Sequence, residues 1–225
     1  NNVQFSNCCG IASIVRGESN KADENWWRVY GLGETGTTEG LIYTNWVQCE
    51  EIPTDARLVA RGLDFGFSQD PTAIVSVYMQ GGDLWLNEEC YLHGLTNDKI
   101  ADILKALPQP QTSIVADSAE LKSIVEIRNY GVRNIEPANK GADSVRNGIQ
   151  IVQRHKLHVT QSSLNLIKEL RNYSWQRDRI SGEWRNEPNK SAHIDHALDA
   201  VRYVCLNKLA QRRHGTARAT IGRQL

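Results

Sequence analysis

The sequence of 225 residues lacks several features that define whole classes of protein. No apolar stretch is long enough to cross a membrane and no basic-then-apolar leader is present, so we expect neither a membrane protein nor a secreted one. The five cysteines include no C-x-x-C pair, which argues against a zinc ribbon and favours reduced thiols inside a cell. Lys plus Arg and Asp plus Glu both number 26, so net charge alone favours no class of partner.

A nucleotide-binding loop is also missing. The segment 31–40 is rich in glycine, but it does not end in the Lys-Ser/Thr pair that reaches the phosphates of a bound nucleotide. We interpret it as a surface connection within an irregular segment that covers residues 1–56. At the other end, residues 212–225 contain arginine but no acidic residue, and they are predicted to form a basic C-terminal tail.

Regular apolar patterns begin at residue 57. Three alternating or β-branched runs separated by turn residues predict an antiparallel meander, and the chain then alternates between helical and strand periods. The strands are expected at 58–64, 73–79, 83–91, 113–117, 132–137 and 157–160, the helices at 97–107, 119–130, 144–154, 163–173 and 193–211, and a hairpin at 175–184. This order predicts an α/β domain over residues 57–211, with a mixed sheet covered by helices on both faces.

Two of the predicted strands end in an aspartate. Asp64 ends the first strand and Asp117 ends the fourth. If these strands pair in parallel, the two carboxylates lie about 5 Å apart at one edge of the sheet, where ligand sites gather in open α/β folds. The repulsion between two such carboxylates is offset by a hard divalent cation or by a shared proton. The alternative is that each aspartate only caps the turn that follows it.

The last predicted helix carries further candidates. Asp195 and Asp199 are four residues apart on one helical face, and His196 precedes Asp199 by three. Asp199 flanks an apolar stripe that would face the sheet. Taken alone, these charges are more typical of the solvent-exposed face of an amphipathic helix than of a site.

Four sequence blocks then carry a family resemblance. They are Gly-Leu-Asp-Phe-Gly-Phe-Ser-Gln-Asp-Pro-Thr-Ala at 62–73, Ala-Asp-Ser-Ala-Glu at 116–120, Ala-Asn-Lys-Gly at 138–141 and His-Ala-Leu-Asp-Ala-Val-Arg-Tyr at 196–203. In this order they resemble the nuclease domain of tailed-bacteriophage terminase large subunits, which has a ribonuclease H-like fold. Upstream, 27–36 and 39–46 resemble the segment that joins that nuclease to its ATPase domain. The resemblance extends over about residues 25–210.

The resemblance implies an activity and a site. It implies a metal-dependent endonuclease that cuts concatemeric viral DNA during genome packaging, by two-metal phosphodiester hydrolysis with Mg²⁺ or Mn²⁺. Asp64, Asp117 and Asp199 correspond to the family's acidic, metal-binding triad, His196 to a supporting catalytic histidine, and Asp195 to a possible residue behind the ligands. Double-stranded DNA, the portal protein and the small terminase subunit are the implied partners, and the host cell cytoplasm is the implied location. No ATPase motif occurs in this chain.

DNA binding requires cations close to the acidic site, because phosphate neutralisation supplies most non-specific affinity. The candidates for DNA contact are Lys140, Arg177, Arg179 and Lys190.

Two other functions stay open at this stage. One is a DNA-binding, resolvase or integrase-type domain with the same fold. The other is a fragment of an ATPase of the actin and sugar-kinase class, which also opens with Asp-x-Gly but needs a second such domain. The presence of all three aspartates favours the nuclease.

Overall fold

A computed structural model of the chain describes residues 40–178, 180–189 and 195–210. From Leu41 onward this part of the chain clusters as one unit. None of its helices has the length and apolar character that crossing a membrane requires.

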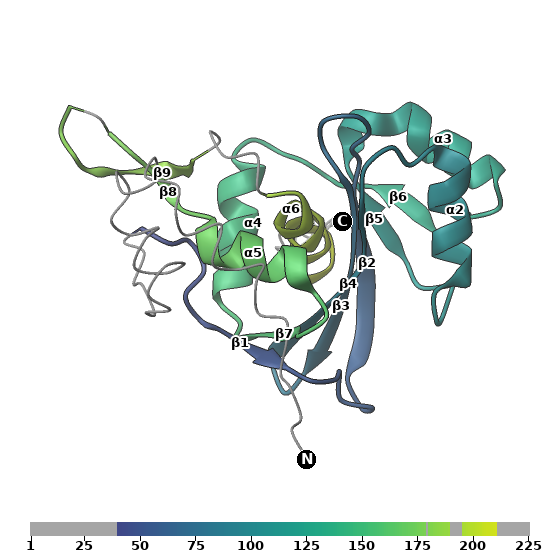
Figure 1. Ribbon diagram of the computed structural model, residues 1–225, viewed down its shortest axis with the longest axis horizontal. Coiled ribbons are helices and arrows are strands. Elements are labelled where there is room, and N and C mark those ends of the chain that lie inside the picture. Colours follow the sequence, from purple (N-terminus) through teal and green to yellow (C-terminus); the bar gives the residue numbers. More distant parts are fainter. Residues whose placement is uncertain (1–39, 179, 190–194, 211–225) are drawn as a thin grey trace, which may run out of the picture. The chain divides into compact units, whose positions relative to one another are not determined.

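A seven-stranded mixed sheet forms the centre of this unit, with strand order β1-β7-β4-β3-β2-β5-β6 (Figure 1). The strands are β1 Trp46–Cys49, β2 Arg57–Asp64, β3 Thr72–Gln80, β4 Asp83–Leu92, β5 Ile114–Ala116, β6 Ile135–Pro137 and β7 Leu157–Thr160. A separate two-stranded hairpin consists of β8 Trp175–Arg177 and β9 Trp184–Pro188. The α/β class and the mixed sheet predicted from the sequence are confirmed.

The pairing of β2 determines where the two strand-end aspartates lie. β2 pairs antiparallel with β3, and β3 with β4, which confirms the predicted meander. On its other side β2 pairs in parallel with β5, with Leu63 opposite Ala116. The amide of Asp117 donates to the carbonyl oxygen of Leu63 at 3.0 Å, so the chain leaves β5 directly beside the end of β2. Asp64 and Asp117 therefore come out at the same edge of the sheet.

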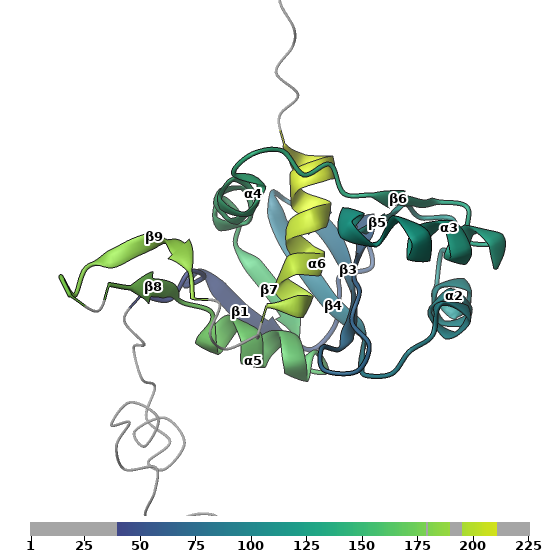
Figure 2. The same cartoon turned by 90° about the horizontal axis from the view of Figure 1, so that it is seen from above.

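Helices cover both faces of the sheet (Figures 1 and 2). On one face lie α2 Asn97–Ala106 and α3 Leu121–Asn129, and on the other lie α4 Ser144–Gln153, α5 Leu164–Asn172 and α6 His196–Val204. A 3-10 turn, Ser118–Glu120, precedes α3, and a π-helical turn, Cys205–Leu209, continues α6. The buried apolar residues form two clusters, one on each side of the sheet.

Helix α6 lies against the central strands because two glycines let it approach. It packs on β2 and β3 on one side and on α4 on the other. A Cβ atom at Gly62 of β2 would lie 1.9 Å from the carbonyl oxygen of Ala200, and one at Gly148 of α4 would lie 2.3 Å from Cγ of Arg202. Any larger residue at Gly62 would push the helix off the sheet.

The structure differs from the sequence-based expectations at several elements. The strand expected at 132–137 is limited to Ile135–Pro137, and the hairpin expected over 175–184 extends to Pro188. Residues 46–49 lie in the segment predicted to be irregular, but they form β1, which pairs in parallel with β7 at the edge of the sheet. For the last helix, expected over 193–211, the α-helical part is His196–Val204, and positions 193, 194 and 211 lie outside the described residues.

Candidate active site

Two strand ends supply the first two carboxylates. Asp64 is the last residue of β2, and only 7% of its surface is exposed. Asp117 follows β5, where its Oδ1 accepts a 2.8 Å hydrogen bond from the amide of Ala119. This bond caps the short helical turn that follows, which is the local role considered for such an aspartate. The capping role and membership of the carboxylate cluster therefore coexist in one side chain.

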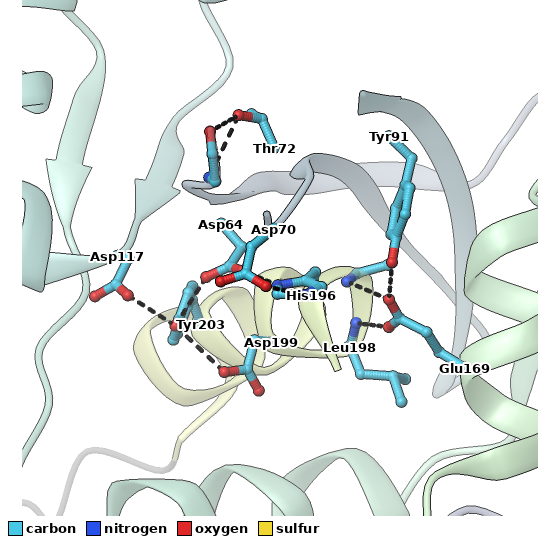
Figure 3. A network of polar contacts seen from close by, with 12 residues as sticks. Asp64, Asp70, Thr72, Tyr91, Asp117, Glu169, His196, Leu198, Asp199 and Tyr203 are labelled. Carbon is cyan, nitrogen blue, oxygen red and sulfur yellow. Dashed lines mark hydrogen bonds and ion pairs between the residues drawn. The ribbon is translucent and has the colours of Figure 1, made fainter. Parts of the chain in front are cut away.

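Helix α6 brings the third carboxylate and the histidine to the same place (Figure 3). Asp199 lies on the first turns of α6, toward the strand ends. Nδ1 of His196 lies 3.1 Å from Oδ2 of Asp64, and its Nε2 lies 3.6 Å from Oδ1 of Asp70. Residues from β2, from the turn after β5 and from α6 thus meet at one edge of the sheet.

The hydroxyl of Tyr203 is the common contact of the three carboxylates. Its oxygen lies 3.2 Å from Oδ1 of Asp64, 3.2 Å from Oδ2 of Asp117 and 3.4 Å from Oδ2 of Asp199 (Figure 3). Burial and then the neighbouring carboxylates raise the pKa of Tyr203, so this hydroxyl keeps its proton. A hydroxyl has one proton to donate, and hence it satisfies one carboxylate at a time.

The protonation equilibria at the site are shifted by burial and by these close contacts. Burial raises the pKa of Asp64 to about 6, although the hydrogen bond with His196 acts in the opposite direction. That same hydrogen bond raises the pKa of His196 to about 9. Burial alone would raise the pKa of Asp117, but the amide of Ala119 and the ammonium group of Lys140 outweigh it and lower the pKa. Shifts of this kind cluster at functional sites.

Two cations flank the carboxylates. Nζ of Lys140 forms an ion pair with Oδ1 of Asp117, lies 3.3 Å from the Tyr203 hydroxyl and stands 4.5 Å above the centre of that ring. Arg202 is buried and holds Asp199 with two contacts, Nη2 to Oδ2 at 2.6 Å and Nε to Oδ1 at 3.1 Å. Each of these two side chains thus pairs with one carboxylate, whereas the contacts of Asp64 come from His196 and Tyr203.

Comparison with known proteins connects this geometry to a family. The family described as the terminase RNase H-like domain matches residues 64–206, a span that begins at the first aspartate of the cluster and includes the other two. The chain belongs to this family. The resemblance carried by the four sequence blocks is thereby confirmed, and so is the ribonuclease H-like fold.

Individual relatives agree with this membership. The chain is 28% identical to the terminase large subunit of Bacillus phage SPP1 over 198 residues, which cover 83% of this chain and 46% of the relative. It is 27% identical to the PBSX phage terminase large subunit of Bacillus subtilis over 158 residues, covering 68% of this chain and 36% of the relative. The chain thus spans less than half of the length of these relatives.

Solved structures show the same fold. The large-terminase nuclease domain of bacteriophage SPP1, determined with bound Mn, matches with a TM-score of 0.63 and 26% identity, over 72% of this chain and 96% of that one. The large terminase of a thermophilic bacteriophage matches with a TM-score of 0.58 and 20% identity, over 86% of this chain and 53% of that one.

The other predicted site residues are Asp195 and the four proposed DNA contacts, and they do not all lie near the carboxylate cluster. Asp195 occupies the capping position before α6 without a capping hydrogen bond from its side chain, and burial followed by the charge of Asp199 raises its pKa. Lys140, predicted to contact DNA, lies inside the carboxylate cluster. Arg177 lies on the hairpin, where its Nε donates to the carbonyl of Gly182 at 2.8 Å. Arg179 and Lys190 lie outside the described residues.

Four residues in or beside the carboxylate cluster were not among the predicted site residues. Tyr203 and Arg202 belong to a sequence block that signals the family, but a tyrosine and an arginine on an amphipathic helix are usually packing and surface residues. Asp70 lies in the loop after Asp64, and nothing local distinguishes it from a turn residue. Glu169 lies on another helix, and only its burial, at 1% exposed, marks it.

The residues present suit a divalent cation. Within the described residues, no three His, Cys, Asp or Glu side chains already stand together with the spacing of a metal site. The three carboxylates instead surround the Tyr203 hydroxyl, which can satisfy only one of them at a time. Carboxylate oxygens are the ligands that Mg²⁺ and Mn²⁺ prefer, so the three aspartates form a donor set that suits such a dication.

Proposed function

We propose that this terminase RNase H-like domain is a metal-dependent endonuclease that hydrolyses phosphodiester bonds of double-stranded DNA. The observation that carries the proposal is the convergence of Asp64, Asp117 and Asp199 on one hydroxyl, from three elements far apart in sequence. Three carboxylates gathered in this way serve no packing purpose and cost electrostatic energy. The SPP1 nuclease domain, which contains bound Mn, supports the choice of cofactor.

Each acidic residue has a place in this proposal. We assign two Mg²⁺ or Mn²⁺ ions to the site; when bound, such a pair activates a water molecule and stabilises the leaving oxygen. Asp64, at the end of a central strand, would be the shared ligand, Asp117 would hold one ion and Asp199 the other. His196 would orient the water or the leaving group, since its Nε2 lies away from Asp64 and toward the exposed loop that carries Asp70. Asp195 would contact the metal-binding residues rather than the metal ions themselves.

The proposal extends to the biological setting by family membership. We infer that the activity cuts concatemeric viral DNA during genome packaging, in the cytoplasm of the host cell, alongside a portal protein and a small terminase subunit. The nuclease domain predicted over residues 57–211 would also include β1, which belongs to the same sheet, while the chain before residue 41 would connect to an ATPase domain and residues 212–225 would form a basic tail. Lys140, Arg177, Arg179 and Lys190 remain the proposed contacts to DNA phosphates.

Plasmid cleavage by isosteric variants tests the proposal. The full chain is incubated with supercoiled plasmid in Mn²⁺, in Mg²⁺ and in EDTA, beside Asp117→Asn, Asp199→Asn and the control Glu136→Gln. Glu136 is a surface carboxylate paired with Lys208 outside the cluster. We expect metal-dependent nicking that survives in the control and falls at least a hundredfold in both Asn variants.

Other outcomes of this experiment would exclude the proposal. Cleavage that persists in EDTA, or in both Asn variants, would rule out the carboxylate site. A folded wild-type chain that binds plasmid in Mn²⁺ without cutting it would instead favour the DNA-binding domain of the same fold.

A further inference from the structure

A buried carboxyl group outside the acidic cluster contacts the start of helix α6. Glu169 lies on α5, and three donors converge on its side chain (Figure 3). Its Oε1 accepts from the amide of Ala197 at 3.1 Å and from the hydroxyl of Tyr91 at 2.9 Å, and its Oε2 accepts from the amide of Leu198 at 2.9 Å. Both oxygens are therefore occupied by groups from two other elements.

The start of α6 depends on this contact for its hydrogen bonds. The first amides of a helix have no partner within the helix, and they are normally capped by the side chain just before it. Asp195 occupies that position but makes no capping hydrogen bond with its side chain. Ala197 and Leu198 are buried, so water does not replace the missing cap. Glu169 supplies the cap from a different helix, because its two oxygens accept from the amides of Ala197 and Leu198.

The amides that Glu169 binds lie between the site residues. His196 directly precedes Ala197, and Asp199 directly follows Leu198. A carboxyl that holds both amides fixes the rotation of the first turn of α6 and its position along the helix axis. Those two coordinates determine whether His196 faces Asp64 and whether the Tyr203 hydroxyl, on the same helix as Asp199, reaches Asp64 and Asp117.

We propose that Glu169 is a positioning residue for the acidic site, which holds the first turn of α6 in the register that brings His196 and Asp199 to Asp64. This rests on the proposed function, because the site it orders is the proposed metal site. Glu169 touches none of the three aspartates in the contacts that the structure records, so its effect passes through the backbone of α6.

Manganese binding by a set of variants tests the proposal. Glu169→Gln keeps the shape of the side chain but turns one acceptor into a donor, which then opposes an amide of α6. Tyr91→Phe removes one donor and leaves both amide contacts. Ile127→Val shortens a buried side chain on α3, on the other face of the sheet, and provides a variant that is destabilised without touching α6.

Two readouts are measured on the full chain, with Mn²⁺ as the probe and no DNA. Thermal unfolding against Mn²⁺ concentration should show an apparent Kd raised at least fivefold in Glu169→Gln, less than twofold in Tyr91→Phe and unchanged in Ile127→Val. Amide hydrogen exchange without metal should be at least tenfold faster in the first turn of α6 of Glu169→Gln, with the exchange of β2 and β3 unchanged.

The outcomes separate this proposal from the proposed function. If the unfolding temperature of the wild-type chain does not change with Mn²⁺ concentration, the proposed metal site is wrong. The proposed role of Glu169 in positioning that site is then wrong as well. If the wild type responds to Mn²⁺ and Glu169→Gln responds equally, or if its α6 exchanges at the wild-type rate, the positioning role alone is wrong. A shift of the same size in Ile127→Val would also overturn it, because loss of stability would then explain the effect.

Discussion

The hydroxyl oxygen of Tyr203 lies 3.2 Å from Oδ1 of Asp64 and, at the same time, within 3.4 Å of an oxygen of Asp117 and of Asp199. Three acceptors surround a group with one proton, so the hydroxyl donates to one carboxylate at a time, and the other contacts of the cluster come from Lys140, Arg202 and His196. Tyr203 therefore cannot donate a hydrogen bond to all three carboxylates at once. A cation bound at this position could contact all three carboxylates at the same time.

Removing this hydroxyl should destabilise the protein in the absence of metal. We expect Tyr203→Phe to lower the free energy of unfolding by about 1–2 kcal/mol in EDTA at neutral pH, because a buried carboxylate loses its donor. Added Mn²⁺ should restore more stability to the variant than to the wild type. Urea unfolding in EDTA and in saturating Mn²⁺ measures both quantities. An equal loss in the two conditions would show that the hydroxyl and the cation do not serve the same carboxylates.

Lys140 was predicted to contact DNA, but the structure places it against a carboxylate of the acidic cluster. Its ammonium group pairs with Asp117, and its side chain is 28% exposed. We expect Lys140→Gln to strengthen Mn²⁺ binding about fivefold without DNA, since Asp117 no longer has to leave an ion pair worth about 1 kcal/mol. Isothermal titration calorimetry measures this affinity, and Arg177→Gln on the hairpin is the control that should leave it unchanged.

The opposite pattern would identify Lys140 as a DNA contact only. In that case Mn²⁺ affinity stays at the wild-type value, while DNA binding weakens and its dependence on salt becomes shallower by about one charge.

The strand-end aspartates could be predicted from the sequence because their signal is local. An apolar strand that stops at Asp64, and another that stops at Asp117, are visible in a few residues, and the meander and alternating periods supply the parallel pairing between them. Asp199 and His196 are different, because an amphipathic helix with these charges is common on protein surfaces. Their helical spacing made them candidates, but only the family resemblance favoured a role in the site over a surface position, and the structure places them beside Asp64 and the Tyr203 hydroxyl.

The missed features depend on contacts between distant segments. Strand β1 has no alternation strong enough to predict a strand, and it is stabilised by parallel pairing with β7. The role of Glu169 requires knowing that α5 ends beside the start of α6. Gly62 reads as an ordinary strand residue until the distance to Ala200 is known. Such relationships arise from tertiary packing, which single-sequence patterns do not encode.

The approach of α6 to the sheet makes Gly62 a sensitive position. A Cβ there would lie 1.9 Å from the carbonyl oxygen of Ala200, which is backbone and cannot rotate away. We expect Gly62→Ala to cost about 3 kcal/mol of unfolding free energy and to reduce cleavage at least a hundredfold by displacing Asp199 from Asp64. Gly141→Ala is the control for stability, since a Cβ at Gly141 meets nothing within 4 Å. It should change the unfolding free energy by less than about 0.5 kcal/mol. Equal effects in urea unfolding would refute the close-packing argument.

The carboxyl of Glu169 should make stability depend on pH in a direction opposite to that of most surface carboxylates. Burial raises its pKa to about 7 from an ordinary value of 4.5, with the amides of Leu198 and Ala197 opposing the shift. Between pH 4.5 and 7 the folded protein therefore holds a proton that the unfolded chain has released. Its contribution to the free energy of unfolding then falls as pH rises, by about 3 kcal/mol across that interval.

Glu169→Gln does not titrate at this position. The free energy of unfolding of the wild type minus that of the variant should therefore decrease from pH 4.5 to 7 and stay level above pH 8. Urea unfolding in EDTA at half-unit steps measures this difference, and a constant difference would mean that the amides of α6 keep Glu169 ionised throughout.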